Sequence, residues 1–481
     1  MDAERLWNEG RRPVPTSEEV PARSEIVVAG AGLTGIAVAL ELAHRGRQVL
    51  VLEADGIGAG TSGGTTGKLS LLQGTRYAEI RRLAGDDALR AYAAANTAGV
   101  AWLRGELRDV PQALADRDAY TYATTDAGAA GLDRERDAAR SAGLVPEVAG
   151  PDIGLPFAVR TALRAEAQGL LDPLRALSAL AARAVGHGAR IVTGCRVTDA
   201  AAADGGVRVS TTRGDVRADR IVLATGFPVP DRAGFFALLS ADRPVRSLRP
   251  ATAHGSPVLV LGGHPFVPGR QASTRAILDG MDRWVDERFG PSRRVSFWGA
   301  QDYRLPSALP FAGPVPGTDG RILAVTGFAK WGLSNAGAAA LTIAETLEGR
   351  RPVWSGPLTS RRMGVRALLT VAGSNAAVAG RLARDWLRPG SRPPAPAPGQ
   401  GRVVRRGWGP PVAEAMTSSG ACRLSAVCTH LGGIVAWNDG EQSWDCPLHG
   451  SRFAPDGRVI EGPAARDLPP ARGSVGLDRL P

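Results

Sequence analysis

The feature that most constrains this chain is a pair of Cys–His boxes close to its C-terminus. Cys428-Thr429-His430 is followed, after fifteen residues, by Cys446-Pro447-Leu448-His449, and the boxes hold half of the chain's four cysteines. Two thiolates on one iron and two neutral imidazoles on the other are the ligands of one type of [2Fe–2S] cluster. A Cys2His2 zinc site is the alternative, although zinc fingers usually pair Cys with Cys and His with His. A third interpretation, unliganded loop residues, leaves the gathering of cysteines unexplained, so the spacing predicts a cluster that moves electrons.

The text around the boxes, CTHLGG and CPLHGSRF, resembles a Rieske iron–sulfur domain over roughly residues 400–480. Gly462-Pro463-Ala464 supplies a further loop, at the place where Rieske proteins cover the cluster. The resemblance implies an all-β domain in which the [2Fe–2S] cluster is held by Cys428, His430, Cys446 and His449.

The chain departs from the respiratory Rieske pattern at several positions. In the respiratory type an extra disulfide links the two boxes, and here those positions are Gly433 and Leu448. Ser451 is present where the high-potential type donates a hydrogen bond to a bridging sulfide, but Phe453 replaces a tyrosine that bonds a cysteine sulfur. Because fewer hydrogen bonds to sulfur lower the reduction potential, we expect an intermediate or low value within the Rieske range of about −150 to +300 mV.

A strand–turn–helix–strand unit occupies residues 24–53. An apolar run leads into Gly30-x-Gly32-x-x-Gly35, a helix of small and apolar residues follows, and a second strand is closed by Glu53. Such a turn needs glycine for its tight bend and for the close approach of the backbone to a pyrophosphate, which lies at the helix N-terminus. Glu53 can accept hydrogen bonds from a ribose diol. The unit therefore predicts a dinucleotide-binding fold but does not by itself separate FAD from NAD.

Further segments are similar to the D-amino-acid-oxidase-like (DAO) family of FAD oxidoreductases. They are residues 58–68, 169–173, 189–197, 220–226, 309–313 and 325–334. The resemblance implies FAD as cofactor and an α/β FAD-binding Rossmann-type fold of the glutathione-reductase-like class. It also implies an inserted α+β substrate domain over about residues 76–165 and 235–300. In the last motif a glycine turn starts a helix at Ser334, and a positive helix end beside the flavin stabilises its anionic reduced form.

The same resemblance implies which residues contact FAD. They are Gly30, Gly32, Leu33, Thr34, Gly35, Glu53, Ala54, Thr61, Ser62, Thr65, Thr66, Lys68, Val197, Thr225, Gly226, Gly313, Gly327, Lys330, Trp331, Gly332, Leu333 and Ser334.

The chain's two lysines, Lys68 and Lys330, both lie in these FAD motifs, although the chain has 58 basic residues. Arginine carries a planar fork and lysine a compact charge, so the two are not interchangeable at a tight site. We expect Lys330 to lie near the N1/C2 carbonyl side of the flavin, and we count it as a candidate catalytic residue. Chance retention of lysine at two exposed positions is the alternative.

Tyr303 and His264 are the other candidate catalytic residues. His264 and His254 could face a substrate, but a lone histidine is more often a packed or surface residue. Tyr303 and Gln301 stand just before the motif at 309–313 and could line the site. No Ser–His–Asp or paired-carboxylate arrangement stands out, and hydride transfer to a flavin depends on orientation more than on a nucleophile.

Composition and patterning predict the order of the segments. They are an N-terminal tail (1–22), a DAO-like domain (23–355), a helical basic extension (356–391), a proline-rich linker (392–401) and a Rieske domain (402–481). The N-terminus lacks the apolar stretch of an export signal, and no apolar run reaches membrane-spanning length, so we expect a cytoplasmic protein. The net charge of +11 comes from scattered arginines, which favours a solvated surface over a nucleic-acid site.

The whole order resembles a bacterial family of Rieske-containing FAD-dependent oxidoreductases. We therefore expect oxidation of a small amine or amino acid at its C–N bond, with electrons passing singly to the cluster and on to an external acceptor. A protein that accepts or donates one electron is a possible partner. Because the cluster gives electrons a route other than dioxygen, a dehydrogenase is favoured over an oxidase.

Three alternatives stay open at this point. The chain could be an NAD(P)H-driven reductase that feeds a partner oxygenase, although no second glycine fingerprint of the first one's quality is found. It could be a tailoring oxidase for a specialised metabolite, which would use the same residues on a larger substrate. It could also be a redox sensor or scaffold without turnover.

Overall fold

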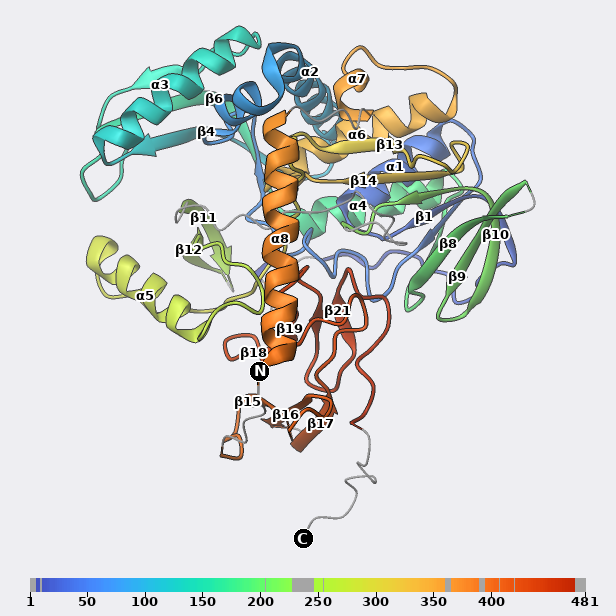
Figure 1. Ribbon diagram of the computed structural model, residues 1–481. Coiled ribbons are helices and arrows are strands. Elements are labelled where there is room, and N and C mark those ends of the chain that lie inside the picture. Colours follow the sequence, from blue (N-terminus) through green and yellow to red (C-terminus); the bar gives the residue numbers. More distant parts are fainter. Residues whose placement is uncertain are drawn as a thin grey trace. The chain divides into compact units, whose positions relative to one another are not determined.

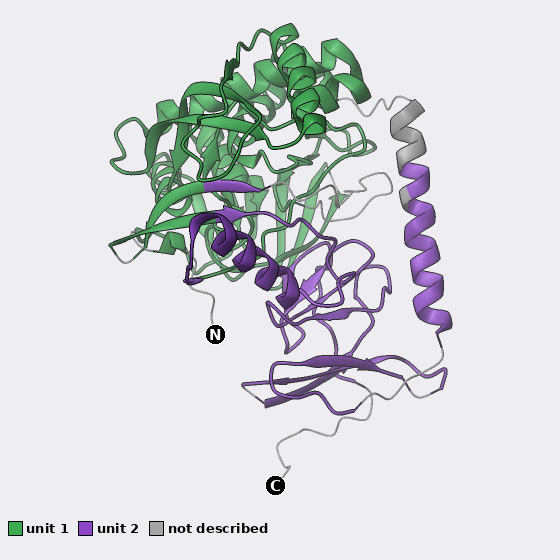
Figure 2. Ribbon diagram, turned by 90° about the vertical axis from the view of Figure 1, so that its left-hand side faces the viewer, with its two compact units in different colours: residues 1–238, 249–260, 296–369 green, residues 239–248, 261–295, 370–481 purple. Residues whose placement is uncertain are grey.

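The computed structural model describes residues 6–8, 11–203, 205–226, 246–253, 255–359, 365–388, 394–405, 407–418 and 420–471 (Figure 1). The chain divides into two compact units, shown in different colours in Figure 2. Unit 1 comprises residues 1–238, 249–260 and 296–369, and unit 2 comprises residues 239–248, 261–295 and 370–481.

Unit 1 is built on a largely parallel sheet, which confirms the predicted α/β class. Its strands run in the order β13 (Phe311–Pro314), β14 (Ile322–Thr326), β10 (Gly214–Leu223), β1 (Arg23–Ala29), β2 (Val49–Leu52) and β7 (Arg190–Val192). Within this path only β13 is antiparallel to its neighbour. Strands β2 and β14 are buried at every residue and almost wholly apolar, because both faces of the sheet are covered. An antiparallel extension of β8 (Val197–Ala203) and β9 (Gly206–Thr211) continues from β10.

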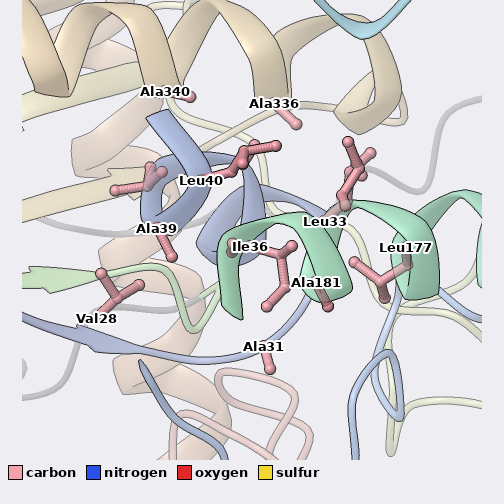
Figure 3. Close-up of a cluster of buried hydrophobic side chains, with 14 of the residues drawn as sticks. Val28, Ala31, Leu33, Ile36, Ala39, Leu40, Leu177, Ala181, Ala336 and Ala340 are labelled. Atoms are coloured by element: carbon pink, nitrogen blue, oxygen red, sulfur yellow. The ribbon is translucent and has the colours of Figure 1, made fainter. Parts of the chain in front are cut away.

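One face of this sheet is covered by α1 (Leu33–His44), α4 (Pro173–Gly186) and α6 (Gly332–Leu347), which share one core. Figure 3 shows Leu33, Ile36 and Leu40 of α1 gathered with Leu177 of α4 and Ala336 of α6. Many of the residues in α1 and α6 are alanine or glycine, which allows the two helices to pack closely. The N-terminal ends of these helices lie at the edge of the sheet where the parallel strands end.

A second sheet of unit 1 consists of β3 (Lys68–Leu69), β6 (Thr161–Leu171), β4 (Leu114–Ala123) and β5 (Glu147–Ala149). It is accompanied by α2 (Arg76–Leu107) and α3 (Asp126–Ser141). The remaining elements before the last part of the chain are η1 (Leu6–Asn8), β11 (Ser247–Ala253), β12 (Ser256–Gly262) and α7 (Ser355–Thr359).

Unit 2 contains two small antiparallel sheets around a core that includes Trp444 and Phe453. The strands are β15 (Gly401–Val404), β16 (Val412–Thr417) and β17 (Gly420–Ser425) in one sheet, and β18 (Ala436–Asn438), β19 (Ser443–Asp445), β20 (Arg452–Phe453) and β21 (Val459–Glu461) in the other. Its helices are α5 (Arg275–Phe289) and α8 (Val365–Leu387). The first residues of α8, up to residue 369, belong to unit 1. Residues 261–295, which the sequence analysis assigns to the inserted substrate segment, thus belong to the same compact unit as the Cys–His boxes. The predicted domain boundaries stay a prediction.

Local predictions hold to within a few residues. The helix expected from Ser334 begins at Gly332, and the strand expected over 189–197 is interrupted, with β7 ending at Val192 and β8 starting at Val197. Within the part of the chain that the structure describes, no helix is both long enough and apolar enough to cross a membrane.

The crossing of α2 and α6 depends on two facing glycines. A Cβ on Gly99 would overlap the carbonyl oxygen of Ser334, and a Cβ on Gly337 would lie 2.6 Å from the carbonyl oxygen of Gly99. The neighbours are main-chain atoms, which cannot rotate away. The contact therefore fixes the position of the first turns of α6 along α2.

We predict that Gly99→Ala destabilises unit 1 by about 1–3 kcal/mol, because the added methyl group overpacks a backbone contact. Gly105→Ala is the matched control, since Gly105 is exposed on the same helix with open space around it. It should stabilise the protein by up to about 1 kcal/mol through helix propensity. Thermal release of flavin fluorescence measures both changes. Equal unfolding temperatures for the two variants would contradict the crossing.

Candidate functional site

The glycine turn after β1 is packed so closely against main-chain atoms that a side chain would not fit. Gly30 has a φ of 101°, and a Cβ there would lie 2.8 Å from the carbonyl oxygen of Ala224. A Cβ on Gly35 would overlap the carbonyl oxygen of Gly30. α1 begins directly after Gly32, whose position at the helix N-terminus has no capping side chain. The main chain is therefore shaped for a pyrophosphate at the positive end of α1.

Glu53 ends β2 beneath this turn. One carboxylate oxygen accepts from Ala31 N at 2.6 Å and the other from Asp55 N at 2.9 Å. Burial raises the pKa of Glu53, and these two N–H donors act in the opposite direction. The carboxylate thus has a fixed orientation where a dinucleotide's ribose hydroxyls bind. These residues fit FAD, which Gly30, Gly32, Gly35 and Glu53 would hold.

The second FAD loop, residues 58–68, is fixed by distant parts of unit 1. Ser62 Oγ accepts from Leu33 N at 2.8 Å, which joins the loop to the first turn of α1. Thr61 Oγ1 donates to the carbonyl of Gln301 at 2.8 Å. The indole of Trp7 donates to the carbonyl of Thr65 at 2.9 Å.

Arg249 adds a contact that the sequence analysis missed. Its guanidinium donates to the carbonyls of Thr66 and Leu171, at 2.9 and 2.8 Å, and lies over the ring of Trp7. Arg249 therefore fixes the loop that leads into Lys68. No local sequence pattern marks it, because its partners are more than seventy residues away.

The two lysines lie close together, as their shared placement in FAD motifs suggests. Burial, and then the positive charge of Lys330, lowers the pKa of Lys68 to about 8. The Lys68 ammonium lies 5.7 Å from the ring centroid of Trp331. Lys68 is only partly exposed, whereas Lys330 is exposed, so chance retention of lysine stays an alternative for Lys330.

A buried carboxylate, Asp302, lies beside Lys330. Burial raises the pKa of Asp302, while the backbone N–H of Lys330, then the charges of Lys330 and Arg304, act in the opposite direction. The sequence analysis selected its neighbours Gln301 and Tyr303 but missed Asp302 itself. Its negative charge in an otherwise uncharged run was the available signal.

The backbone before α6 is strained. Ala329 and Lys330 have φ values of 51° and 74°, a left-handed conformation that costs about 1–3 kcal/mol for each non-glycine residue. Directly after them Trp331 starts α6 without a capping side chain. The strain sets the direction of Lys330 and leaves the N-terminus of α6 open for the flavin.

A buried polar network holds the first turn of α6. Gln73 Nε2 donates to Asn96 Oδ1 at 3.0 Å and to Ser334 Oγ at 3.1 Å, and the hydroxyl of Tyr92 donates to Gln73 Oε1 at 2.6 Å. All four side chains are buried. Because they come from a loop and two helices far apart in the chain, only Ser334 was selected from sequence.

The remaining predicted residues are distributed over both units. Tyr303 is buried, and its ring lies against Gly226 of unit 1. His264 has a φ of 51° and belongs to unit 2, whereas Tyr303 and Lys330 belong to unit 1. A joint role for these three residues stays a prediction, and residue 254 lies outside the described residues. The other predicted FAD residues, Thr34, Ala54, Val197, Thr225, Gly313, Gly327, Gly332 and Leu333, lie in unit 1, in or beside α1, β2, β8, β10, β13, β14 and α6.

The Cys–His boxes form two facing loops in unit 2. Cys428 and Cys446 are buried and form no disulfide, and the thiol of Cys446 donates to the sulfur of Cys428, which lowers the pKa of Cys428 to about 6. The rings of His430 and His449 meet edge to face, with 5.1 Å between centroids, and both are half-buried. Two buried thiols beside two more exposed imidazoles fit a cluster with two cysteines on the inner iron and two histidines on the outer one.

The zinc alternative differs in the number of metal ions. A tetrahedral zinc site brings its ligands to a single ion, whereas a two-iron cluster has two protein ligands on each iron.

Ser451 links the cluster loops to the loop at residues 462–464. Its hydroxyl donates to the sulfur of Cys428, which contributes to the lowered pKa of that thiol, and accepts from Ala464 N at 3.0 Å. A Cβ on Gly433 would lie 2.7 Å from Leu448 Cδ1. The two residues at the positions of the respiratory disulfide are thus in direct contact.

Comparison with known proteins agrees with this geometry. The model of the FAD dependent oxidoreductase (DAO) family matches residues 25–346, and that of the Rieske [2Fe-2S] domain matches residues 415–472. The chain belongs to the DAO family of FAD-dependent oxidoreductases. The resemblance drawn from the sequence is confirmed, and with it FAD and the [2Fe–2S] cluster as cofactors.

One relative shares the whole architecture. A Bacillus subtilis protein named as a Rieske 2Fe-2S iron-sulfur protein, YhfW, is 28% identical in an alignment 477 positions long, which covers 92% of this chain and 92% of that protein. Glycine oxidase from Geobacillus kaustophilus is 19% identical over 72% of this chain and all of its own, with a TM-score of 0.53. L-amino acid deaminase from Proteus vulgaris is 15% identical over 73% of this chain and all of its own, with a TM-score of 0.57. The likeness to these two structures shows the fold.

We predict that Ser451→Ala lowers the reduction potential of the cluster, because a hydrogen bond to a ligand sulfur is lost. An EPR-monitored redox titration measures the change. Ser418→Ala is the control, since Ser418 is exposed in the turn between β16 and β17. A wild-type potential in Ser451→Ala would show that this hydroxyl does not act on the cluster.

Proposed function

We propose that this protein is an amine or amino-acid dehydrogenase. When bound, FAD takes a hydride from the carbon next to the substrate nitrogen, and the cluster provides a one-electron path away from the reduced flavin. The substrate loses that hydride and an N–H proton, and water hydrolyses the resulting imine to a carbonyl compound and an amine. The observation that carries this proposal is the group of Lys68, Lys330 and Asp302 beside the FAD motifs.

The two lysines supply positive charge, Lys68 from a partly exposed position and Lys330 from an exposed one. Lys68 keeps its proton at neutral pH, since its pKa is about 8. Two neighbouring ammonium groups suit a substrate carboxylate or the negative charge that reduction adds to a flavin. Their proximity to the N-terminus of α6 adds a positive helix end to the same region.

Asp302 limits the repulsion between the two lysines. Its carboxylate accepts the backbone N–H of Lys330, so it orients the strained segment that presents this ammonium. Arg249 and the Gln73 network hold the two loops on which the lysines stand. These contacts thus orient the segments that carry the two lysines.

The names of the matched structures support the substrate class. Glycine oxidase and L-amino acid deaminase both act on amino acids, as their names state. A C-terminal Rieske domain adds an exit for single electrons, which distinguishes a dehydrogenase from an oxidase that reduces dioxygen directly. The acceptor would be a one-electron carrier, such as a small redox protein.

A turnover screen with a panel of amino acids and amines tests the function. We expect turnover with ferricyanide as acceptor to exceed oxygen consumption for the true substrate. Faster turnover with dioxygen would indicate an oxidase. Activity with NADH or NADPH alone would instead indicate a reductase that serves a partner.

The pKa of Lys68 predicts a pH dependence. Because this lysine loses its charge as the pH rises through about 8, affinity for a carboxylate ligand such as anthranilate should fall above that pH, by at most about tenfold per unit. Lys68→Met should remove the step. Lys330→Met should move the step to higher pH, because the charge of Lys330 lowers the pKa of Lys68. Perturbation of the flavin spectrum measures the affinity, and an unchanged step in both variants would contradict the assignment.

Lys330 should also be sensitive to a change that keeps its charge. Lys330→Arg places a larger planar group on a residue with a φ of 74°, between Lys68 and Asp302. We expect a lower flavin affinity, a shifted flavin potential and slower turnover, because the two cations are not interchangeable at a tight site. Wild-type flavin affinity, flavin potential and turnover in Lys330→Arg would show that Lys330 is not part of the flavin site.

A further inference from the structure

Two segments outside the Rieske-matching residues contact the cluster loops of unit 2. One is residues 269–275, which lead into α5, and the other is the C-terminal part of α8. The matched Rieske residues are 415–472, so neither segment belongs to that domain. Residues 261–295 also continue into unit 1 at both ends of the segment.

The first segment lies against the second Cys–His box. Arg270 Nε donates to the carbonyl of Pro447 at 2.8 Å, beside the ligand Cys446. A Cβ on Gly269 would lie 2.5 Å from the carbonyl oxygen of Asp445 and 2.8 Å from Pro447 N. The backbone of the segment therefore lies directly on the backbone of the loop, where a side chain would not fit.

Asp439 fastens the same segment to the Rieske strands. Its carboxylate accepts from Thr274 N at 2.7 Å, Arg275 N at 3.0 Å and Ser273 Oγ at 2.6 Å. Burial would raise the pKa of Asp439, but these donors, Ser273 first, hold it at about 2. Asp439 thus stays charged at neutral pH and caps the N-terminus of α5, where a negative charge is favourable.

The second segment holds the first Cys–His box. The indole of Trp386 on α8 donates to the carbonyl of Gly432 at 2.9 Å, next to Gly433. Arg405 donates to the carbonyl of Trp386 at 2.7 Å and lies over its ring. Val378 and Leu382 of the same helix pack against the core of the Rieske sheets.

We propose that residues 269–275 and Trp386 form a collar that holds the two cluster loops, and that Arg270 is a positioning residue for the cluster. No disulfide joins the loops, since Cys428 and Cys446 form none and Gly433 meets Leu448 by packing alone. Trp386 bonds the residue before Gly433, and Arg270 bonds the residue before Leu448. The two hydrogen bonds of the collar therefore hold the residue before Gly433 and the residue before Leu448, one on each side of the packing contact.

Arg270 has an electrostatic effect besides its hydrogen bond. Arg270 is exposed but contacts the loop that holds the cluster. Reduction adds one negative charge to the cluster, and a nearby cation stabilises that charge. Arginine remains protonated under these conditions. Arg270 therefore raises the cluster potential and opposes the effect of Phe453. This inference depends on the cluster alone and is independent of the substrate.

EPR-monitored redox titration of the full-length protein with its cluster tests the role of Arg270. Arg270→Gln should favour oxidation of the cluster by about tenfold in the one-electron equilibrium, a fall of about 59 mV. Arg270→Lys keeps the charge and should shift the potential less. Arg283→Gln is the matched control, because it removes an exposed arginine from the same segment. Equal potentials in wild type, Arg270→Gln and Arg283→Gln would overturn the electrostatic role.

Cluster retention tests the collar itself. Trp386→Phe keeps the ring but removes the donor to Gly432, and Asp439→Asn removes the charge that caps α5. We expect both to lose iron to a chelator at least several times faster than wild type, measured by the visible absorbance of the cluster. Wild-type rates in both variants would overturn the collar. Arg270→Gln could fail to retain a cluster. In that case, cluster retention in Arg270→Lys supports the proposal. Loss of the cluster in Arg270→Lys, together with wild-type retention in Trp386→Phe and Asp439→Asn, contradicts it.

Discussion

The flavin half of this protein depends on the close approach of main chain to main chain at a few glycines. Gly30 and Gly35 bring α1 onto β1, and Gly99 and Gly337 bring α2 onto α6. Neither Gly32 nor Trp331, the N-cap residues of α1 and α6, caps its helix with its own side chain, although Ser62 Oγ accepts from Leu33 N. Two positive helix ends are thus left for the phosphates and the flavin of one cofactor, and the lysines, Asp302 and the polar network around Ser334 are arranged on the same framework.

The Rieske half follows a different principle, because its four ligands come from short loops that have little regular structure of their own. Hydrogen bonds from Ser451, the packing of Leu448 on Gly433 and the contacts from residues 269–275 and α8 hold these loops. Residues 261–295 take part in unit 2 although the chain on both sides belongs to unit 1. The two redox modules are therefore interleaved in sequence, unlike two domains joined by one linker.

The two family resemblances could be read from the sequence because their motifs are encoded at short, fixed spacing. The two Cys–His boxes, the glycine turn with Glu53 and the motif around Lys330 each lie within one stretch of chain, so their partners are visible together. Arg249, Asp302 and Gln73 were missed because each acts on residues brought close only by the tertiary fold. For the same reason the inserted segment was assigned to the substrate side alone, since nothing near Arg270 in sequence points to Pro447.

The central claim is that electrons pass from substrate through FAD to the cluster of the same chain. The most direct test is anaerobic addition of one equivalent of substrate, followed by absorbance and by EPR of rapidly frozen samples. The account predicts loss of the oxidised flavin spectrum first and then growth of a rhombic Rieske signal, at a rate independent of protein concentration. A flavin that is fully reduced while the cluster stays oxidised, or a rate that rises with protein concentration, would contradict it.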